Sequence, residues 1–448
     1  MIHKYFAVSA RGIEIVTAAE LEQLGAQNVR AVFGGVHFEG DIELLYRASL
    51  WLRTASRILR PLRDFASQNA EMLYSQTRRV RWEDFLDPAK TLAVHATIEG
   101  AAGRAEHARA ENSRAESSQS RPPERRDKPA RGRFSASKPE PQGINHSMFA
   151  ALKIKDAIVD RLRREQGARP NVDKENPDIL VHAHFAGGRC TLSLDATGSS
   201  LHERGYRIRS TTAPLKETLA SAIIDLTKWD DCAPFFDPMC GSGTLAIEAA
   251  MKAMHIAPGL ARPSFAFQRW PEFDGKAWQR IVDDARKQKL AAPRGQFFAT
   301  DSDPDVINIA QDNARRAGVA DFIQFGVRQF GALQPPTEQP GFVVTNPPYG
   351  TRLGQESELQ ELYEEMSAVL KERYAGWQVF IMAGNLNLAR HITLTATQKI
   401  KLNNGPLDCR LLKFEIPRNK LTPAAFEQPE RSMSEDEAQV PADASPPS

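Results

Sequence analysis

The chain has few cysteines, and none of them forms a Cys-x-x-Cys pair. The four cysteines of the 448 residues are Cys190, Cys232, Cys240 and Cys409. Because these four lie far apart without Cys-x-x-Cys spacing, we expect neither a disulfide framework nor a structural zinc site, and no other metal site. The sequence also lacks an apolar run of about 18 residues, which a membrane-spanning helix requires. Its amino terminus lacks a signal-peptide pattern, so we expect a cytoplasmic protein without membrane contact.

An excess of one charge is missing as well. The chain has 58 Lys and Arg against 56 Asp and Glu, a formal net charge of +2. This balance argues neither for nor against a nucleic-acid partner, so the local distribution of charge carries more information. The length predicts two or three domains, and 41% hydrophobic residues are enough to form their cores.

Large apolar side chains are nearly absent between Glu99 and Gly143, where Ala, Arg, Glu, Ser and Pro dominate. Such a segment cannot bury enough apolar surface to offset its ordering entropy. We therefore predict a disordered insertion at about 100–143, which is either a basic arm that binds phosphates or a surface loop. The tail at 417–448 is acidic and rich in proline, and it is predicted to be disordered too.

Three folded units are predicted between these segments. Residues 1–60 form a small α/β unit that starts with the strand-like run Lys4–Ser9. Residues 61–208 form a second α/β unit, with a strand expected at 179–185. Residues 209–416 form the third unit, which contains the two motifs described next.

The most informative stretch is the apolar run Phe342–Thr345 and the turn Asn346-Pro347-Pro348-Tyr349 that closes it. The run predicts a buried strand, which must end at the two prolines because proline cannot donate ladder hydrogen bonds. Asn346 is therefore expected at the carboxyl end of a strand, where open α/β sheets bind ligands. Its side-chain oxygen and the Pro347 carbonyl are two acceptors that suit an NH2 group, and Tyr349 offers a face for stacking a base. An ordinary turn is the alternative.

A second motif is the glycine turn Asp237–Thr244, between an apolar strand end and an alanine-rich helix. Gly241 and Gly243 permit positive φ angles and close approach of a ligand to the backbone, beside the free N–H groups of the helix amino terminus. The turn by itself fits a nicotinamide, a flavin or a methyl donor equally. Asp301, after a later apolar strand, supplies the acid expected to hold ribose hydroxyls. It follows the turn by far more than the roughly 20 residues of a dehydrogenase fingerprint, which disfavours nicotinamide.

The two motifs resemble those of class I S-adenosylmethionine-dependent methyltransferases that alkylate exocyclic amines. Further segments narrow the resemblance to the bacterial THUMP-domain 23S rRNA guanine-N2 methyltransferases, the RlmL family. These segments are Asn145–Asp160, Arg169–Asp173, Leu201–Arg207, Ala213–Ala220 and Asn403–Cys409. The resemblance implies an α/β protein, in which ferredoxin-like and THUMP domains precede a Rossmann-like methyltransferase domain with a mostly parallel seven-stranded sheet and antiparallel last strands. Some members carry a second methyltransferase half, and this chain ends before one, so the stand-alone form is expected.

The resemblance also implies a reaction and its residues. S-adenosylmethionine would methylate the N2 amine of a guanine, with 23S rRNA or a pre-50S particle as partner. The catalytic residues implied are Asn346, Pro347, Pro348 and Tyr349. The Asn346 side-chain oxygen and the Pro347 carbonyl would hold the amine, without a strong base. The residues implied for the methyl donor are Asp237, Pro238, Cys240, Gly241, Gly243, Thr244, Asp301, Gln329 and Thr218. Relatives commonly carry Asp where this chain has Gln329, whose amide oxygen can still accept a hydrogen bond from adenine. Cys240 is expected to be a small packing residue rather than a nucleophile.

Candidate RNA-binding residues follow from local charge. Arg204, Arg207 and Arg209 crowd the junction before the third unit, where they form either a phosphate clamp or a solvated linker. Lys153 and Lys155 are a second candidate pair.

Other readings stay open at this point. The same chemistry serves guanine-N2 in tRNA or an adenine amine, and a non-catalytic RNA-binding protein with a methyltransferase-like fold is a rival of another class. A nicotinamide oxidoreductase is the third alternative, but that function would not explain the Asn-Pro-Pro-Tyr turn. The oligomeric state is not predicted.

Overall fold

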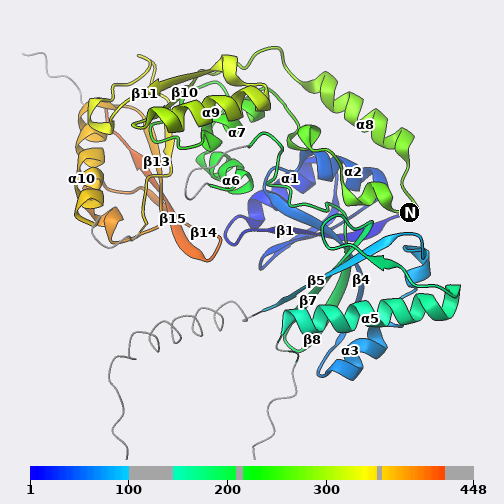
Figure 1. Ribbon diagram of the computed structural model, residues 1–448. Coiled ribbons are helices and arrows are strands. Elements are labelled where there is room, and N and C mark those ends of the chain that lie inside the picture. The colour runs from blue at the N-terminus through cyan, green and yellow to red at the C-terminus, as the bar shows by residue number, and fades with distance from the viewer. Residues whose placement is uncertain (100–143, 145, 208–214, 351–355, 419–448) are drawn as a thin grey trace, which may run out of the picture.

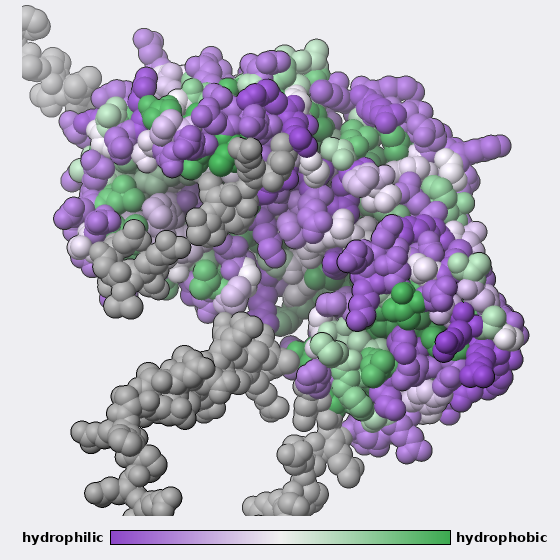
Figure 2. Space-filling view, viewed as in Figure 1, coloured by the Kyte–Doolittle hydropathy of each residue, from purple (hydrophilic) through white to green (hydrophobic). Residues whose placement is uncertain are grey.

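A computed structural model describes residues 1–99, 144, 146–207, 215–350 and 356–418. These residues form two lobes, each built on one β-sheet (Figure 1). The predicted insertion at 100–143 and nearly all of the predicted tail lie outside the described residues. On the visible face hydrophilic residues predominate, with smaller hydrophobic patches on both lobes (Figure 2). Among the described residues, no helix is both long and apolar enough to cross a membrane.

The first lobe contains a single eight-stranded sheet with the order β2-β3-β1-β4-β8-β7-β5-β6. Its strands are β1 (His3–Ser9), β2 (Gln27–Val32), β3 (Gly35–Gly40), β4 (Ala55–Ala66), β5 (Thr91–Ile98), β6 (Asn171–Val172), β7 (Ile179–Ala186) and β8 (Arg189–Asp195). The boundary that the sequence predicts between residues 60 and 61 lies inside β4, which pairs with β1 on one side and β8 on the other. The two amino-terminal units therefore share one sheet.

Helices cover one face of this sheet and are set by recognisable local signals. They are α1 (Glu14–Gln23), α2 (Ile42–Trp51), α3 (Ala70–Thr77), η1 (Trp82–Asp84) and α5 (Ser147–Gln166). The Asp41 carboxylate starts α2 by accepting a hydrogen bond from the Leu44 N–H at 2.7 Å. Gly167 ends α5 with a φ of 76°, a left-handed conformation that suits glycine. Alternate residues of β7 are buried against the helices, which is the pattern of a sheet covered on one face.

The second lobe contains a seven-stranded sheet with the order β11-β10-β9-β12-β13-β15-β14. The first five strands in this order are parallel: β9 (Phe235–Asp237), β10 (Phe297–Asp301), β11 (Ile323–Val327), β12 (Phe342–Thr345) and β13 (Gln378–Ala383). β15 (Leu407–Glu415) is antiparallel to β13 and to β14 (Gln398–Asn404). This topology confirms the predicted mostly parallel sheet with antiparallel last strands.

A hydrophobic core lies on each face of this second sheet. Phe235 and Phe236 are adjacent in β9 and are buried in different cores, because successive side chains of a strand point to opposite faces. One core is formed with α6 (Glu217–Thr227), α7 (Thr244–Ala253), α9 (Pro304–Ala317) and η4 (Ala320–Phe322). The other is formed with η5 (Phe330–Ala332), α10 (Glu356–Arg373) and η6 (Leu388–His391). The parallel sheet is thus covered on both faces.

One segment of the third unit packs on the first lobe. It contains η2 (Pro258–Ala261), η3 (Ala266–Arg269) and α8 (Gly275–Gln288), and its apolar residues belong to the core of the amino-terminal sheet. The ring of Tyr46 on α2 stacks on Phe267 at 4.8 Å between centroids and meets Trp278 edge-on at 5.9 Å. The two lobes are therefore joined by a shared aromatic core as well as by the chain junction.

Candidate active site

A cavity of about 980 Å³ opens at the carboxyl ends of β9, β10 and β12. It lies where the strand order reverses, with β10 and β11 on one side of β9 and β12 and β13 on the other. Ligands of open α/β sheets bind at such a switch point. The volume is at the upper end of the range for small-molecule sites, so it can hold a nucleoside-sized cofactor together with part of a second ligand.

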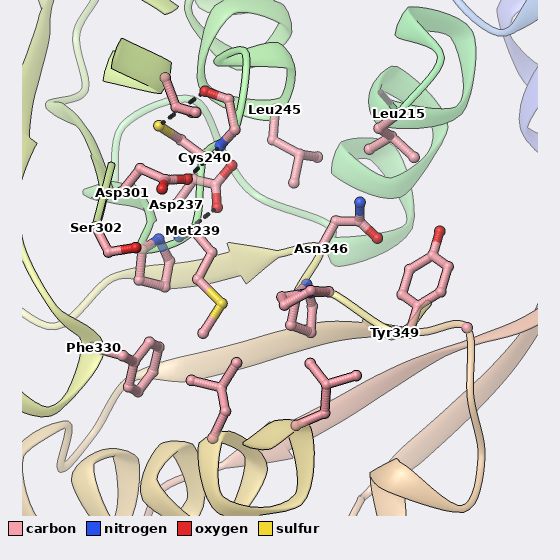
Figure 3. A pocket seen from close by; sticks show the side chains of 18 of the residues that line it. Leu215, Asp237, Met239, Cys240, Leu245, Asp301, Ser302, Phe330, Asn346 and Tyr349 are labelled. Atoms are coloured by element: carbon pink, nitrogen blue, oxygen red, sulfur yellow. Dashed lines mark hydrogen bonds between the residues drawn. The ribbon is translucent and has the colours of Figure 1, made fainter. Parts of the chain in front are cut away.

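The Asn-Pro-Pro-Tyr turn lies on one side of this cavity (Figure 3). β12 ends at Thr345, as the two prolines predict. The side-chain oxygen of Asn346 is buried and has no hydrogen-bond partner among the described residues. Buried polar atoms in folded proteins are nearly always bonded, so an acceptor left open toward a cavity is suited to a donor on a ligand.

Tyr349 is half-buried beside Asn346, and its ring is held in place from two sides. The Asn404 side-chain N–H donates to its hydroxyl at 2.9 Å. Gly384 lies so close beneath the ring that an added Cβ would be 2.4 Å from it. No local sequence signal marks Gly384 or the Asn404 side chain, because both act through contacts between segments far apart in the chain.

The glycine turn forms the other side of the cavity. Gly241 and Gly243 have φ angles of 52° and 83°, which side chains with a Cβ rarely adopt. The Cys240 N–H donates to the Thr300 carbonyl at 2.8 Å, which joins the turn to β10. The Gly241 N–H donates to the Asp301 carboxylate at 3.0 Å. The turn is therefore fixed by its neighbouring strand before any ligand binds.

Comparison with known proteins places this geometry in a family. Residues 4–59 match the RlmL ferredoxin-like domain, residues 140–195 match the THUMP domain, and residues 204–413 match the RMKL-like methyltransferase domain. A Synechocystis protein assigned provisionally as an RNA methyltransferase is 38% identical over 92% of this chain and 96% of its own length. This chain belongs to the RlmL family of methyltransferases.

A second RlmL-family relative is longer than this chain. The ribosomal RNA large subunit methyltransferase K/L of Syntrophotalea carbinolica is 38% identical over 96% of this chain. The match spans 56% of that relative's own length.

Solved structures agree with the RlmL-family fold. The crystal structure of SMU.472, a provisionally assigned methyltransferase complexed with SAH, has a TM-score of 0.77 and 28% identity, and covers 94% of this chain and 99% of its own. A predicted N6-adenine-specific DNA methylase from Listeria monocytogenes has a TM-score of 0.75 and 28% identity, and covers 93% of this chain and 97% of its own.

The residues implied for the methyl donor of this RlmL-family protein divide into two groups. Those that line the cavity are Asp237, Pro238, Cys240, Gly241, Thr244, Asp301 and Gln329. Thr218 is buried on α6 and Gly243 lies within the turn, and neither lines the cavity. Burial raises the pKa of the Cys240 thiol well above its ordinary value, which fits the predicted packing role and not that of a nucleophile.

Two carboxylates, the buried Asp237 and the partly exposed Asp301, shape the turn end of the cavity. Asp237 is 1% exposed and accepts the Met239 N–H at 3.3 Å. Burial raises the pKa of Asp237 to about 7, against the opposing effects of the Thr345 side chain and the Met239 N–H, and the nearby charge of Asp301 contributes a smaller part of the rise. Asp301 accepts backbone N–H groups on both oxygens, from Gly241 at 3.0 Å and Asp303 at 3.2 Å. Each oxygen keeps a lone pair with which it can accept a ribose hydroxyl.

Asp237→Asn is expected to change how stability depends on pH. A carboxyl group with a pKa of about 7 in the folded protein and near 3.8 when unfolded favours folding at low pH. This contribution is fully present below about pH 4 and is lost as the pH rises through 7. The free energy of unfolding of the variant, measured in urea relative to wild type, should therefore increase between pH 5 and pH 8. An unchanged difference between these pH values would contradict the raised pKa.

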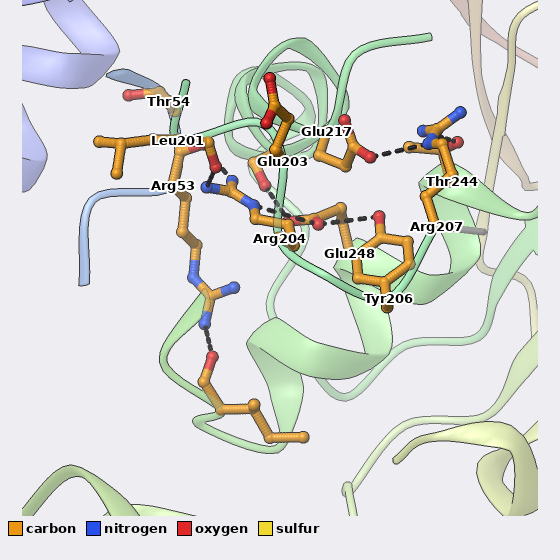
Figure 4. Close-up of polar contacts among 12 residues, drawn as sticks. Arg53, Thr54, Leu201, Glu203, Arg204, Tyr206, Arg207, Glu217, Thr244 and Glu248 are labelled. Carbon is orange, nitrogen blue, oxygen red and sulfur yellow. Dashed lines mark hydrogen bonds and ion pairs between the residues drawn. The ribbon is translucent and has the colours of Figure 1, made fainter. Parts of the chain in front are cut away.

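The structure corrects the prediction for Arg204, which lies between the lobes rather than on a phosphate-binding surface (Figure 4). Its side chain is 2% exposed. The guanidinium donates to the carbonyls of Arg53 at 2.5 Å and Leu201 at 2.8 Å, and it lies 3.5 Å from the Glu248 carboxylate. A buried guanidinium with these partners cannot reach an RNA phosphate. The sequence does not distinguish a buried arginine between two lobes from a surface arginine that binds phosphate, because both have the same local charge pattern.

Arg207 contacts the glycine turn instead of solvent. Its guanidinium donates to the Ser242 hydroxyl at 3.2 Å and to the Thr244 hydroxyl at 2.8 Å. It also donates to the Glu217 carboxylate at 2.8 Å and to the Leu215 carbonyl at 2.9 Å. The clamp prediction does not fit these contacts, which instead tie the turn to the start of α6.

Arg207→Lys is expected to raise the dissociation constant for S-adenosylhomocysteine by roughly 10-fold or more, since hydrogen bonds to a charged group are each worth about 1.5–3 kcal/mol. Lysine keeps the charge but lacks the planar fork that bridges Ser242 and Thr244. Calorimetric titration measures the effect. Arg161→Lys is the matched control, because Arg161 makes a forked contact with Glu83 in the first lobe. Equal affinities in both variants would show that the turn keeps its shape without Arg207.

The remaining RNA candidates keep the status of predictions. Lys153 and Lys155 are both partly exposed on α5, and Lys155 forms an ion pair with Asp156 at 2.5 Å. Arg209 lies outside the described residues.

Proposed function

We propose that this protein transfers a methyl group from S-adenosylmethionine to the exocyclic N2 amine of a guanine in 23S rRNA. The observation that carries the proposal is the buried, unpartnered side-chain oxygen of Asn346 at the cavity. This oxygen can accept a hydrogen bond from an N–H donor on a ligand, and an exocyclic amine has two N–H groups.

The cavity fits S-adenosylmethionine, the cofactor of this family. When bound, it supplies an electrophilic methyl group. Asp301 would hold the ribose hydroxyls beside the glycine turn, since its carboxylate already lies against the Gly241 N–H. Gln329 lines the cavity after β11 and would accept a hydrogen bond from the adenine amine.

Asn346 and Pro347 would prepare the amine for attack. The nitrogen of guanine N2 is a weak nucleophile because its lone pair is delocalised into the ring. Two acceptors, the Asn346 side-chain oxygen and the Pro347 carbonyl, would bind both amine hydrogens and favour a pyramidal nitrogen. Positive charge develops on this nitrogen during transfer, and fixed acceptors stabilise it most at that moment. The described residues that line the cavity include no histidine, in keeping with a proton that leaves after the transfer.

The residues around Asn346 favour an RNA base as the substrate. Tyr349 offers a fixed ring beside Asn346, and base–aromatic stacking contributes about 1–3 kcal/mol per base. A base reaches such a pocket only when it is unpaired or flipped out of its stack. The THUMP match and the rRNA methyltransferase K/L relative favour RNA, and a large-subunit rRNA or pre-50S particle in particular.

The substrate class is tested by transfer of labelled methyl groups to three acceptors. Protein-free 23S rRNA from a strain lacking this gene, bulk tRNA and duplex DNA are compared under the same conditions. We expect label in 23S rRNA only. Label in tRNA alone would overturn the rRNA assignment. Label in DNA alone would also overturn it and would favour DNA methylation, the activity for which the Listeria neighbour is named. If no acceptor is labelled while S-adenosylhomocysteine still binds, a pre-50S particle is tested next, and failure there would leave a binding protein without catalysis.

A further inference from the structure

Phe33 is an exposed aromatic residue at the turn between β2 and β3. Its side chain is 66% exposed. The Arg11 guanidinium carbon lies 4.2 Å from the centre of the ring, in a cation–π arrangement. An exposed arginine on an exposed aromatic ring is a common element of surfaces that stack nucleic-acid bases.

The loop that carries Arg11 contacts the hairpin that holds the base-stacking tyrosine. The Asn403 N–H donates to the Arg11 carbonyl at 3.1 Å. Gly12 lies so close to β14 that an added Cβ would be 2.2 Å from the Lys401 carbonyl oxygen. The next residue after Asn403 is Asn404, whose side chain donates to the Tyr349 hydroxyl at 2.9 Å. Figure 1 shows the end of β14 beside the amino-terminal lobe near β1. Contacts therefore run without a break from Arg11 to the cavity.

Glu14 fixes the Phe33 turn to the Arg11 loop. One carboxylate oxygen of Glu14 accepts the Gly34 N–H at 3.0 Å, and the other accepts the Gly12 N–H at 2.7 Å. The Ser9 N–H donates to the Gly34 carbonyl at 3.1 Å. The ring is thus presented by a backbone that is already ordered, which reduces the entropy lost when a ligand binds.

The charges around the turn suit a phosphate backbone. Arg11 is exposed beside the ring, and Lys399 and Lys401 are exposed on β14, the edge strand that the Arg11 loop contacts. Lysine and arginine side chains next to a stacking ring are the usual composition of a site for single-stranded nucleic acid. A protein partner would need a contiguous apolar patch, whereas Phe33 lies beside the exposed Arg11, and the Glu14 carboxylate between them is held by two backbone N–H groups.

We propose that Phe33 and Arg11 form a subsite for a nucleotide next to the target base. Phe33 stacks on the neighbouring base, while Arg11 and Lys401 contact the phosphates, so the amino-terminal lobe presents the strand to the cavity in the other lobe. The subsite rests on the proposed function in one respect, that the target is a base in RNA.

The test measures binding of a fluorescent single-stranded oligoribonucleotide by anisotropy, which needs no methyl transfer. Phe33→Ala and Phe33→Leu are each expected to weaken binding by about 5- to 100-fold, the range for loss of one stacked base. Phe33→Trp should bind as wild type does, because it restores a flat ring. Leu290→Ala, which changes another exposed apolar residue just after α8, is the control and should bind normally.

Kinetics on 23S rRNA provide the second readout. The three Phe33 variants should bind S-adenosylhomocysteine as wild type does, and Phe33→Ala should raise KM for RNA with little change in kcat. Normal oligonucleotide binding by both Phe33→Ala and Phe33→Leu would overturn the subsite, as would weakened binding by Phe33→Trp equal to that of Phe33→Ala. A wild-type protein that binds the oligonucleotide through Phe33 but methylates no RNA would refute the proposed function and leave the subsite standing.

Discussion

Asn346→Ala is expected to lower the rate constant of methyl transfer by about 10²- to 10³-fold, the usual effect of removing one preorganised group that stabilises developing charge. The Asn346 side-chain oxygen is buried and has no hydrogen-bond partner among the described residues, so the substitution breaks no hydrogen bond of that atom within them. The affinity for S-adenosylhomocysteine should therefore stay near that of wild type. Single-turnover kinetics with labelled donor measure the rate, and calorimetry measures the affinity.

Asn385 provides the matched control for this substitution. It also lines the cavity, but its side-chain oxygen accepts the backbone N–H groups of Asn387 at 2.9 Å and Leu388 at 3.4 Å. Asn385→Ala should lower thermal stability and leave the single-turnover rate largely intact. A wild-type rate in Asn346→Ala would remove the amine-binding role, whatever the effect on stability.

Arg204→Met is expected to lower the free energy of unfolding by about 3–5 kcal/mol, because it leaves a buried carboxylate without its cation. That carboxylate is Glu248, which is 0% exposed and accepts hydroxyl hydrogen bonds from Tyr206 at 3.0 Å and Ser221 at 2.6 Å. Two neutral donors do not replace the lost charge. Methionine fills a similar volume, so the expected loss comes mainly from the lost ion pair and the two lost hydrogen bonds to the carbonyls of Arg53 and Leu201. Guanidinium unfolding followed by circular dichroism measures it.

Two further variants separate this explanation from a packing defect. Glu248→Gln combined with Arg204→Met removes both charges and should recover part of the lost stability. Arg189→Met breaks the exposed ion pair with Asp64 and should cost less than about 1 kcal/mol. If the double variant were as unstable as Arg204→Met alone, the ion pair would not be the source of the effect.

The two motifs of the second lobe could be predicted from the sequence because the conformation of each depends on residues within the motif itself. Two prolines after a β-branched run must end a strand, and β12 does end at Thr345. Glycines at 241 and 243 permit positive φ angles, which both adopt. Strand ends and backbone conformation depend mainly on neighbouring residues, so the end of β12 and the conformation of the glycine turn could be predicted from the sequence.

The lobe junction could not be read in the same way, because its contacts join distant segments. The sequence places Arg204 and Arg207 in a run of basic residues, and nothing local indicates that Glu248 and Glu217 lie beside them. The shared sheet was missed for a related reason, since β4 continues through the predicted boundary at residue 60. The attachment of η3 and α8 to the first lobe likewise depends on Tyr46, more than 200 residues earlier in the chain.

The most direct test of the proposed reaction identifies the methylated nucleoside. Protein-free 23S rRNA is treated with the protein and S-adenosylmethionine, digested to nucleosides and analysed by mass spectrometry beside an Asn346→Ala reaction. We predict N2-methylguanosine with the wild-type protein and a loss of at least about 100-fold with the variant. N6-methyladenosine in its place, or N2-methylguanosine that is unaffected by the loss of Asn346, would contradict the account.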